Sequence, residues 1–85
     1  MRFTVELVVS LKEGLLDPQG KAVQDALPSL GWSNVTEVRV GKHIALTVDA
    51  VDERAATEQV EEMARRFLSN PVIEGFRVLQ VETAG

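Results

Sequence analysis

The stretch 11-LKEGLLDPQGKAVQDALPSLGW-32 carries both a helix start and a helix stop. Asp17 is a preferred N-cap residue, because its carboxylate accepts hydrogen bonds from the free N–H groups of a first helical turn, and Pro18 fits the next position. Gly31 tolerates the left-handed conformation that commonly ends a helix. We therefore expect a helix that begins at Pro18, with one apolar stripe at helical spacing. The stripe comprises Val23, Ala26, Leu27 and Leu30.

Pro28 complicates the end of this helix. It has no N–H to donate to the carbonyl of Gln24, and a proline in a helix interior costs about 3 kcal/mol. The residue before a proline is also pushed away from the helical conformation. The helix is therefore expected either to kink or loosen in its last turn, or to stop near Ala26.

Three strands are predicted in the first half of the chain. Residues 3–11 alternate apolar with mainly polar side chains, which is the pattern of a half-buried strand. Val35–Val40 and Ile44–Val48 are expected to form a hairpin around Gly41. An odd-length loop of Gly41 to His43, or a bulge, would pair Val40 with Ile44 and keep one apolar face.

A helix and a last strand are predicted in the second half of the chain. Residues 52–69 place apolar side chains at helical spacing, and Asn70 with Pro71 stops the pattern. Residues 76–82 read as a strand with two apolar faces, which we expect a second subunit to cover in part. The apolar positions of the helix are Ala56, Val60, Met63, Ala64 and Phe67.

The expected element order is βαββαβ, in one domain over residues 1–85. Right-handed crossovers then favour a ferredoxin-like α+β fold, a two-layer sandwich with an antiparallel sheet of order 4-1-3-2 and both helices on one face. The alternative is an intertwined or rearranged variant of this fold within a dimer.

Composition narrows the classes of function. The chain has 85 residues, no cysteine and a net charge of −4. So small a chain hides only about 60–65% of its surface on folding, so we expect oligomerisation, at least to a homodimer. Its negative charge disfavours nucleic acid and anionic membranes as partners, and its apolar runs are too short to span a bilayer. No signal-peptide pattern follows Arg2, so a cytoplasmic location is expected.

Residues for catalysis are scarce. With no cysteine and a single histidine, His43, the chain offers neither a thiolate nucleophile nor a histidine-pair metal motif. Glu13 and Asp17 are four residues apart and could act as paired carboxylates, but Asp17 already has a role as N-cap. We predict no catalytic, cofactor-binding or metal-binding residue.

Two glycine-containing segments resemble minimal anion sites, though neither matches a known phosphate motif. One combines Gly14 and Gly20 with Lys12 and Lys21 near a helix start, and the other is Gly41 with Lys42. A helix cap explains the first segment better than an anion site does, and a hairpin turn is the corresponding explanation for the second.

Four segments together resemble the PurS family, the small subunit of phosphoribosylformylglycinamidine synthase. They are KEGLLDPQGKAVQDAL, LGW, VRVGKHIAL and NPVIEGFRV, and they span nearly the whole chain. The resemblance implies a non-catalytic subunit that dimerises and bridges the glutaminase PurQ and the synthetase PurL, so that ammonia passes between them. It also implies that ATP and Mg²⁺ are used by the complex, with no cofactor held by this chain alone.

The same resemblance implies partner contacts at the positions that match the family. These are Lys12, Glu13, Asp17, Pro18, Gln19, Gly20, Lys21, Gly41, Lys42, Asn70, Pro71, Ile73 and Glu74.

Two other classes share the expected element order. A regulatory module of the ACT type would bind a small molecule at a subunit interface near the first loop. A small phosphatase-like enzyme would need an arginine in that loop, where this chain offers Lys12. The fold alone does not separate these classes.

Overall fold

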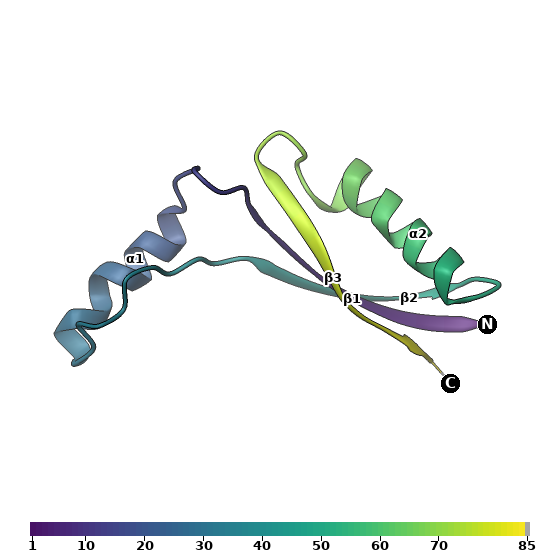
Figure 1. The fold of residues 1–85 in the computed structure, drawn as a ribbon, viewed down its shortest axis with the longest axis horizontal. Helices are drawn as coiled ribbons and strands as arrows, with labels where there is room; N and C mark the ends of the chain where they lie inside the picture. Colours follow the sequence, from purple (N-terminus) through teal and green to yellow (C-terminus); the bar gives the residue numbers. More distant parts are fainter. Residues whose placement is uncertain (85) are drawn as a thin grey trace.

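A computed structural model describes residues 1–84. It contains one antiparallel sheet and two helices (Figure 1). A short 3₁₀ turn follows the first helix, and a π-helical turn follows the second. In chain order the elements are β1 (Arg2–Leu11), α1 (Pro18–Ala26), the 3₁₀ turn η1 (Leu27–Leu30), β2 (Lys42–Asp49), α2 (Glu53–Met63), the π-helical turn η2 (Ala64–Leu68) and β3 (Glu74–Thr83).

The sheet has three strands in the order β2-β1-β3, so β1 is central. The register pairs Leu7 with Ile44 and Val5 with Leu46, which puts the apolar residues of β1 and β2 on one face. The predicted α+β class and antiparallel sheet are confirmed. The predicted βαββαβ order and the 4-1-3-2 sheet are wrong, because residues 35–40 are extended but belong to no strand.

The predicted hairpin around Gly41 is therefore also wrong. Ile44 pairs with Leu7 of β1, and not with Val40. The N–H of Val40 instead donates to a side chain, Asp17, so the backbone at this position has its partner outside the sheet.

A register shift in β3 explains the two apolar faces predicted for the last strand. Opposite Glu6 and Leu7, the pairing passes from Gln80 to Val78, so Leu79 is an extra residue. Such a bulge moves the residues beyond it to the other face of the strand. Phe76, Val78 and Val81 consequently all pack against the core. Only Leu79 leaves the pattern, and it is exposed.

The core lies between the sheet and α2. Phe3, Val5, Leu7 and Val9 of β1 are buried, and the helix covers them with residues spaced four apart. Those residues are Ala56, Val60 and Ala64. Figure 1 shows α2 lying along the sheet and α1 projecting away from it. The expectation that both helices cover one face is therefore wrong for α1.

Residues 15–40 form an arm that extends from the sheet and returns to it (Figure 1). The molecule measures 51 × 29 × 13 Å and has a radius of gyration of 16.3 Å, whereas a compact chain of this length has about 12 Å. The arm therefore lacks the cover that a compact domain gives its own helices. Its exposed large apolar residues are Leu15, Leu16, Val23, Leu30, Trp32 and Val35.

The local signals at the helix ends are confirmed. Asp17 is the N-cap of α1, Pro18 is its first residue, and α1 stops at Ala26, after which Pro28 lies in the 3₁₀ turn. Gly31 then adopts a left-handed φ of 109°. Among residues 1–84 no helix is long and apolar enough to cross a membrane.

The end of the second helix differs from the prediction at Phe67. The N–H of Ser69 donates to the carbonyl of Ala64, five residues earlier, which closes a π-turn. This wider turn keeps Leu68 packed against the core and leaves Phe67 outside, 86% exposed. Phe67 was expected on the buried stripe, and that expectation is wrong.

Candidate functional site

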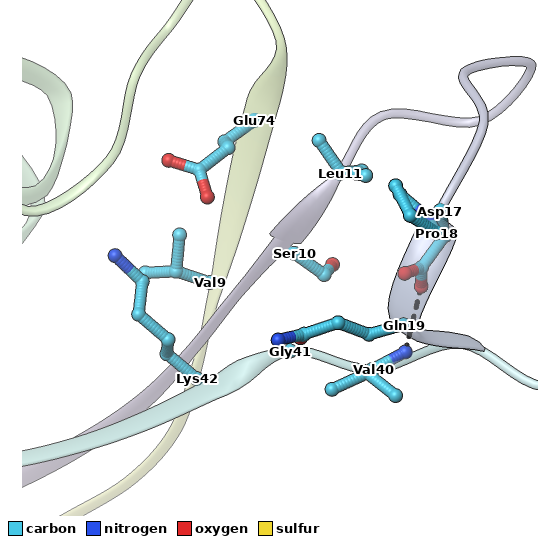
Figure 2. Close-up of a pocket in the computed structure, with 10 residues that line it drawn as sticks. All are labelled: Val9, Ser10, Leu11, Asp17, Pro18, Gln19, Val40, Gly41, Lys42 and Glu74. Atoms are coloured by element: carbon cyan, nitrogen blue, oxygen red, sulfur yellow. Dashed lines mark hydrogen bonds between the residues drawn. The ribbon is translucent and has the colours of Figure 1, made fainter. Parts of the chain in front are cut away.

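Three segments that are far apart in the sequence meet at the end of the sheet where the arm begins. They are the loop after β1 (12–17), the segment before β2 (38–41) and the turn before β3 (70–74). A pocket of about 430 Å³ lies between the sheet and the start of α1 (Figure 2). Its lining comprises Val9, Ser10, Leu11, Asp17, Pro18, Gln19, Val40, Gly41, Lys42 and Glu74.

Asp17 connects the outgoing and returning halves of the arm. Its Oδ1 accepts the N–H of Gly20 at 2.9 Å, which is the expected helix cap, and its Oδ2 accepts the N–H of Val40 at 2.7 Å (Figure 2). These hydrogen bonds favour the ionised carboxylate. The hydrogen bond from Gly20, followed by that from Val40, holds the pKa of Asp17 below its ordinary value.

Arg39 makes a second connection at the same place. Its Nη2 donates to the carbonyl of Leu11 at 2.6 Å and lies 3.4 Å from that of Lys12, which are the last residue of β1 and the first residue after it. The guanidinium also lies 3.7 Å from the carboxylate of Glu37. Arg39 therefore fixes the returning segment to the end of the central strand.

Two glycines allow the chain segments to approach closely. A Cβ at Gly20 would overlap the carbonyl oxygen of Val38, and a Cβ at Gly41 would lie 2.8 Å from that of Val9. Gly20 is buried. Both contacts are with backbone, which cannot swing aside as a flexible side chain can, so a larger side chain at either position would force the chain segments apart.

Lys12 ties the first loop to the turn before β3. Its N–H donates to the carbonyl of Ile73 at 2.9 Å, and its Nζ donates to the carbonyl of Pro71 at 2.7 Å. Within the turn, the N–H of Asn70 donates to Oε1 of Glu74 at 2.8 Å. The loop, the turn and the sheet end are thus joined through a series of hydrogen bonds to backbone groups.

The structure brings together most of the residues predicted to contact a partner. Five of them do not line the pocket but lie in or next to the same three segments, where they contact one another or the lining residues: Lys12, Gly20, Asn70, Pro71 and Ile73. Glu13 is exposed on the loop, and Lys21 pairs with Asp25 along α1 at 2.7 Å. The predicted residues that line the pocket itself are Asp17, Pro18, Gln19, Gly41, Lys42 and Glu74.

Sequence reasoning missed Arg39 and Val40 as members of this site. Both were assigned to a strand, where the backbone of Val40 would pair with another strand and Arg39 would face solvent. The available signal was an arginine between two valines directly before a glycine, at the point where the chain re-enters the sheet.

The chemistry of the site suits structural contact. Among residues 1–84 no group of three or more His, Asp or Glu side chains is arranged to hold a metal ion. His43 lies on β2, where its Nε2 is 3.2 Å from Oε1 of Glu6. Asp17 already accepts hydrogen bonds at both oxygens, so it is occupied as a structural acceptor and poorly placed to act as a general base.

Comparison with known proteins gives a consistent result. Residues 4–82 match the family model described as PurS: Phosphoribosylformylglycinamidine (FGAM) synthase. The chain is 47% identical over 75 residues to the phosphoribosylformylglycinamidine synthase subunit PurS of Bacillus subtilis, covering 88% of each chain.

Solved structures agree with the sequence comparison. The chain is similar to Thermus thermophilus PurS, with a TM-score of 0.87 and 36% identity over 100% of both chains. It is also similar to a chain of the PurLQS structure from Thermotoga maritima, with a TM-score of 0.84 and 29% identity over 93% of this chain and 96% of that one.

Proposed function

The chain belongs to the PurS family of phosphoribosylformylglycinamidine synthase, and we propose on that premise that it is the small, non-catalytic subunit of this synthase in purine biosynthesis. The observation that carries the proposal is the match to the family over residues 4–82, supported by the fold along the whole chain of a solved PurS.

The chemistry of the chain supports a non-catalytic role. Release of ammonia from glutamine through a covalent intermediate needs an activated nucleophile such as a thiolate, and the chain has no cysteine. We propose that the PurQ subunit performs this step, and that PurL uses ATP and Mg²⁺ to transfer the ammonia. The Thermotoga maritima relative belongs to a structure named PurLQS, which supports these two partners.

We propose that the chain bridges its partners as a homodimer or higher oligomer. Its arm carries several large apolar residues that its own sheet does not cover, Leu30 and Trp32 among them. Burying that surface against a second copy would supply the hydrophobic area that a chain of 85 residues lacks. The arm is thus the proposed homodimer surface.

We propose the base of the arm as the contact surface for the larger subunits. The supporting observation is that the three segments predicted from the family resemblance converge there. Because Asp17, Arg39 and Gly20 hold this region in one arrangement, a partner that binds it meets a preorganised surface. Lys12, Glu13, Gln19, Lys42 and Glu74 are the side chains that we expect to contact a partner.

Positioning of two partners by this subunit would serve the reaction. Ammonia is mostly protonated at neutral pH and is lost once it diffuses into bulk water, so a fixed arrangement of the two active sites is an advantage. We propose the cytoplasm as the compartment, since the proposed reaction uses glutamine and ATP.

The alternative of an ACT-type regulatory module has lost its main support. That hypothesis relied on a sheet of four strands, whereas the sheet has three because residues 35–40 are not part of it. The observed order β2-β1-β3 accompanies the PurS fold.

Reconstitution with purified PurL and PurQ tests the proposal. Omitting this chain is expected to abolish synthesis driven by glutamine and to spare part of the synthesis driven by high external ammonium. Full glutamine-dependent activity without the chain would refute the assignment. Equal loss of both activities would refute the bridging role and indicate a direct part in the synthetase site.

A further inference from the structure

Residues 35–40 have the pattern of a strand, although no strand within residues 1–84 pairs with them. The chain runs from this segment through Gly41 into β2 without turning back (Figure 1). Val38 and Val40 are half-buried, whereas Glu37 and Arg39 are exposed, and this alternation is typical of a strand with one covered face. The segment is therefore suited to join a sheet.

One edge of this segment faces its own arm, and the other edge is free. The carbonyl of Thr36 accepts a hydrogen bond from the side chain of Gln24 at 3.3 Å, and the N–H of Val40 donates to Asp17 at 2.7 Å. Within residues 1–84, the backbone groups of residues 35, 37 and 39 make no hydrogen bond. Because successive backbone groups of a strand point to opposite edges, these three residues offer a free edge to a further strand.

β2 has a free edge of its own. In the order β2-β1-β3 it pairs only with β1, so its other edge has no neighbour in the described sheet. The run from Ile44 to Val48 has neither a charged side chain nor a bulge, which are the features that commonly protect an edge strand. The other edge strand, β3, has both, with a bulge at Leu79 and charges at Arg77 and Glu82. β2 is therefore the edge that is open to pairing.

The apolar side chains of β2 also lack a complete cover. α2 packs mainly against β1 and β3, and Ile44, Leu46 and Val48 of β2 are only partly buried. The arm has the complementary shortage, since Val23 of α1 and Leu30 of η1 are 44% and 66% exposed. One chain thus has an apolar helix face without a sheet and an apolar sheet margin without a helix, and two copies can cover each other.

The sequence favours one register for this pairing. Placing Val40 opposite Ile44 and Val38 opposite Leu46 keeps the apolar side chains on one face. A single copy does not form these pairs, because all four residues lie along one extended run of backbone. Two copies related by a twofold axis near residue 42 form them twice, since residues 35–40 of each copy then lie along β2 of the other.

We propose that two copies intertwine, with residues 35–40 of each copy adding a fourth strand to the free edge of β2 in the other. α1 accompanies this strand, because Asp17 and Gln24 hold the helix beside it, and lies over the apolar side chains of the same β2. A second copy is the partner, since one chain carries both halves of each contact. The inference rests on the proposed homodimer and identifies the surface that the arm meets. Each sheet then has the order 4-1-3-2 with two helices on one face, assembled from two chains.

Cysteine cross-linking of the full-length chain tests this arrangement, since the sequence has no cysteine of its own. In the proposed register Glu37 of one copy lies opposite Thr47 of the other, and both are exposed in one copy. Co-expressed Glu37→Cys and Thr47→Cys chains should therefore form a covalent dimer, at twice the 9.3 kDa of one chain, when copper phenanthroline oxidises them. Each variant alone should stay at 9.3 kDa, because its two cysteines would be roughly 30 Å apart in the intertwined dimer.

Glu82→Cys is the matched control for Thr47→Cys. Both positions lie opposite Thr4, Thr47 on β2 and Glu82 on β3, so they mark the two edges of the sheet at the same level. Co-expressed with Glu37→Cys, the control variant should give no covalent dimer. A covalent dimer through Glu82→Cys, or through Thr47→Cys alone, would overturn the proposed pairing.

Hydrogen exchange gives a second measure without any substitution. The amide N–H groups of residues 35, 37 and 39 have no acceptor within residues 1–84 of one copy. In the intertwined dimer they should exchange at least tenfold more slowly than the same amides in an unstructured peptide, whereas Ser33 and Asn34, which precede the segment, should not. Unprotected amides at all three positions would contradict a strand at this edge.

The pairing and the proposed function fail in different ways. The mixture of cysteine variants might dimerise in light scattering and restore glutamine-dependent synthesis with PurL and PurQ, yet give no covalent dimer; that result would overturn the intertwined pairing and leave the proposed function intact. A wild-type chain that stays at 9.3 kDa would overturn the pairing and the proposed homodimer together.

Discussion

The backbone N–H of Val40 donates to Oδ2 of Asp17 at 2.7 Å, across 23 positions of the chain. The other oxygen of the same carboxylate caps α1. One side chain therefore determines both where the helix begins and where the returning segment lies against it. This pair, with the bonds from Arg39 to the end of β1, holds the arm at its angle to the sheet.

Asp17→Asn should separate the two roles of this carboxylate. Asparagine caps a helix about as well as aspartate, but its amide N–H₂ would face the N–H of Val40, two donors with no acceptor between them. We expect a lower thermal midpoint than wild type and an intact secondary structure by circular dichroism. Asp17→Ala, which loses both bonds, should have a lower midpoint still. An unchanged midpoint in Asp17→Asn would mean that the contact with Val40 contributes nothing.

Acidification should weaken the base of the arm. The folded protein holds the pKa of Asp17 below its ordinary value of 3.8. A lowered pKa means that the unfolded chain binds the proton first, so the contribution is complete above pH 3.8 and is lost as pH falls through the lower, folded pKa. The difference in denaturation midpoint between wild type and Asp17→Asn should therefore shrink over this acidic range. A constant difference would contradict the ionised carboxylate.

Gly20→Ala should destabilise the protein by about 1–3 kcal/mol, because the added methyl group overlaps the carbonyl of Val38 in a region where backbone must move. Gly75→Ala is the control, since a Cβ there meets nothing within 4 Å. Urea denaturation of the two variants gives the comparison. Equal stability would show that the arm yields easily at its base.

Local chemistry made the helix starts and stops predictable. Asp17 and Pro18 mark the start of α1 through local hydrogen bonding and backbone geometry alone. Pro28 excludes a regular α-helical turn at its end. The alternation of β1 was equally clear, because one face of a central strand packs against the core along its whole length.

Tertiary contacts overrode the sequence pattern in three places. Residues 35–40 alternate as a strand does, but their partners are Asp17 and the end of β1. The bulge at Leu79 and the π-turn before Ser69 each add one residue to a regular element, so the side chains beyond them change face. A periodic pattern contains no mark of such an insertion, and for this reason Phe67 was expected on the buried stripe and the last strand was expected to have two apolar faces. The family resemblance grouped the residues expected to contact a partner, and the structure brings most of them together at the base of the arm, but their contact with a partner stays a prediction.

Because of the bulge, the arm and not β3 is the surface on which we expect dimerisation. With Val78 and Val81 both in the core, the last strand offers little uncovered apolar surface, whereas Leu30 and Trp32 on the arm are 66% and 56% exposed. We therefore predict that Leu30→Gln with Trp32→Gln converts the protein to a 9.3 kDa species in light scattering at micromolar concentration. Neither side chain is buried in one copy, so circular dichroism should change little.

Leu79→Gln is the matched control for this last prediction, because Leu79 is a partly exposed leucine on the sheet. It should leave the dimer intact if the arm is the dimer surface. The opposite result, a monomer with Leu79→Gln and a dimer with the arm variant, would place the second copy on the sheet. A wild-type protein that stays at 9.3 kDa across micromolar concentrations would refute the dimer itself. So small a chain has one helix, α2, packed over a sheet of three strands, and no other element covers residues 15–40. For this reason we expect a second copy to bury the apolar side chains of the arm.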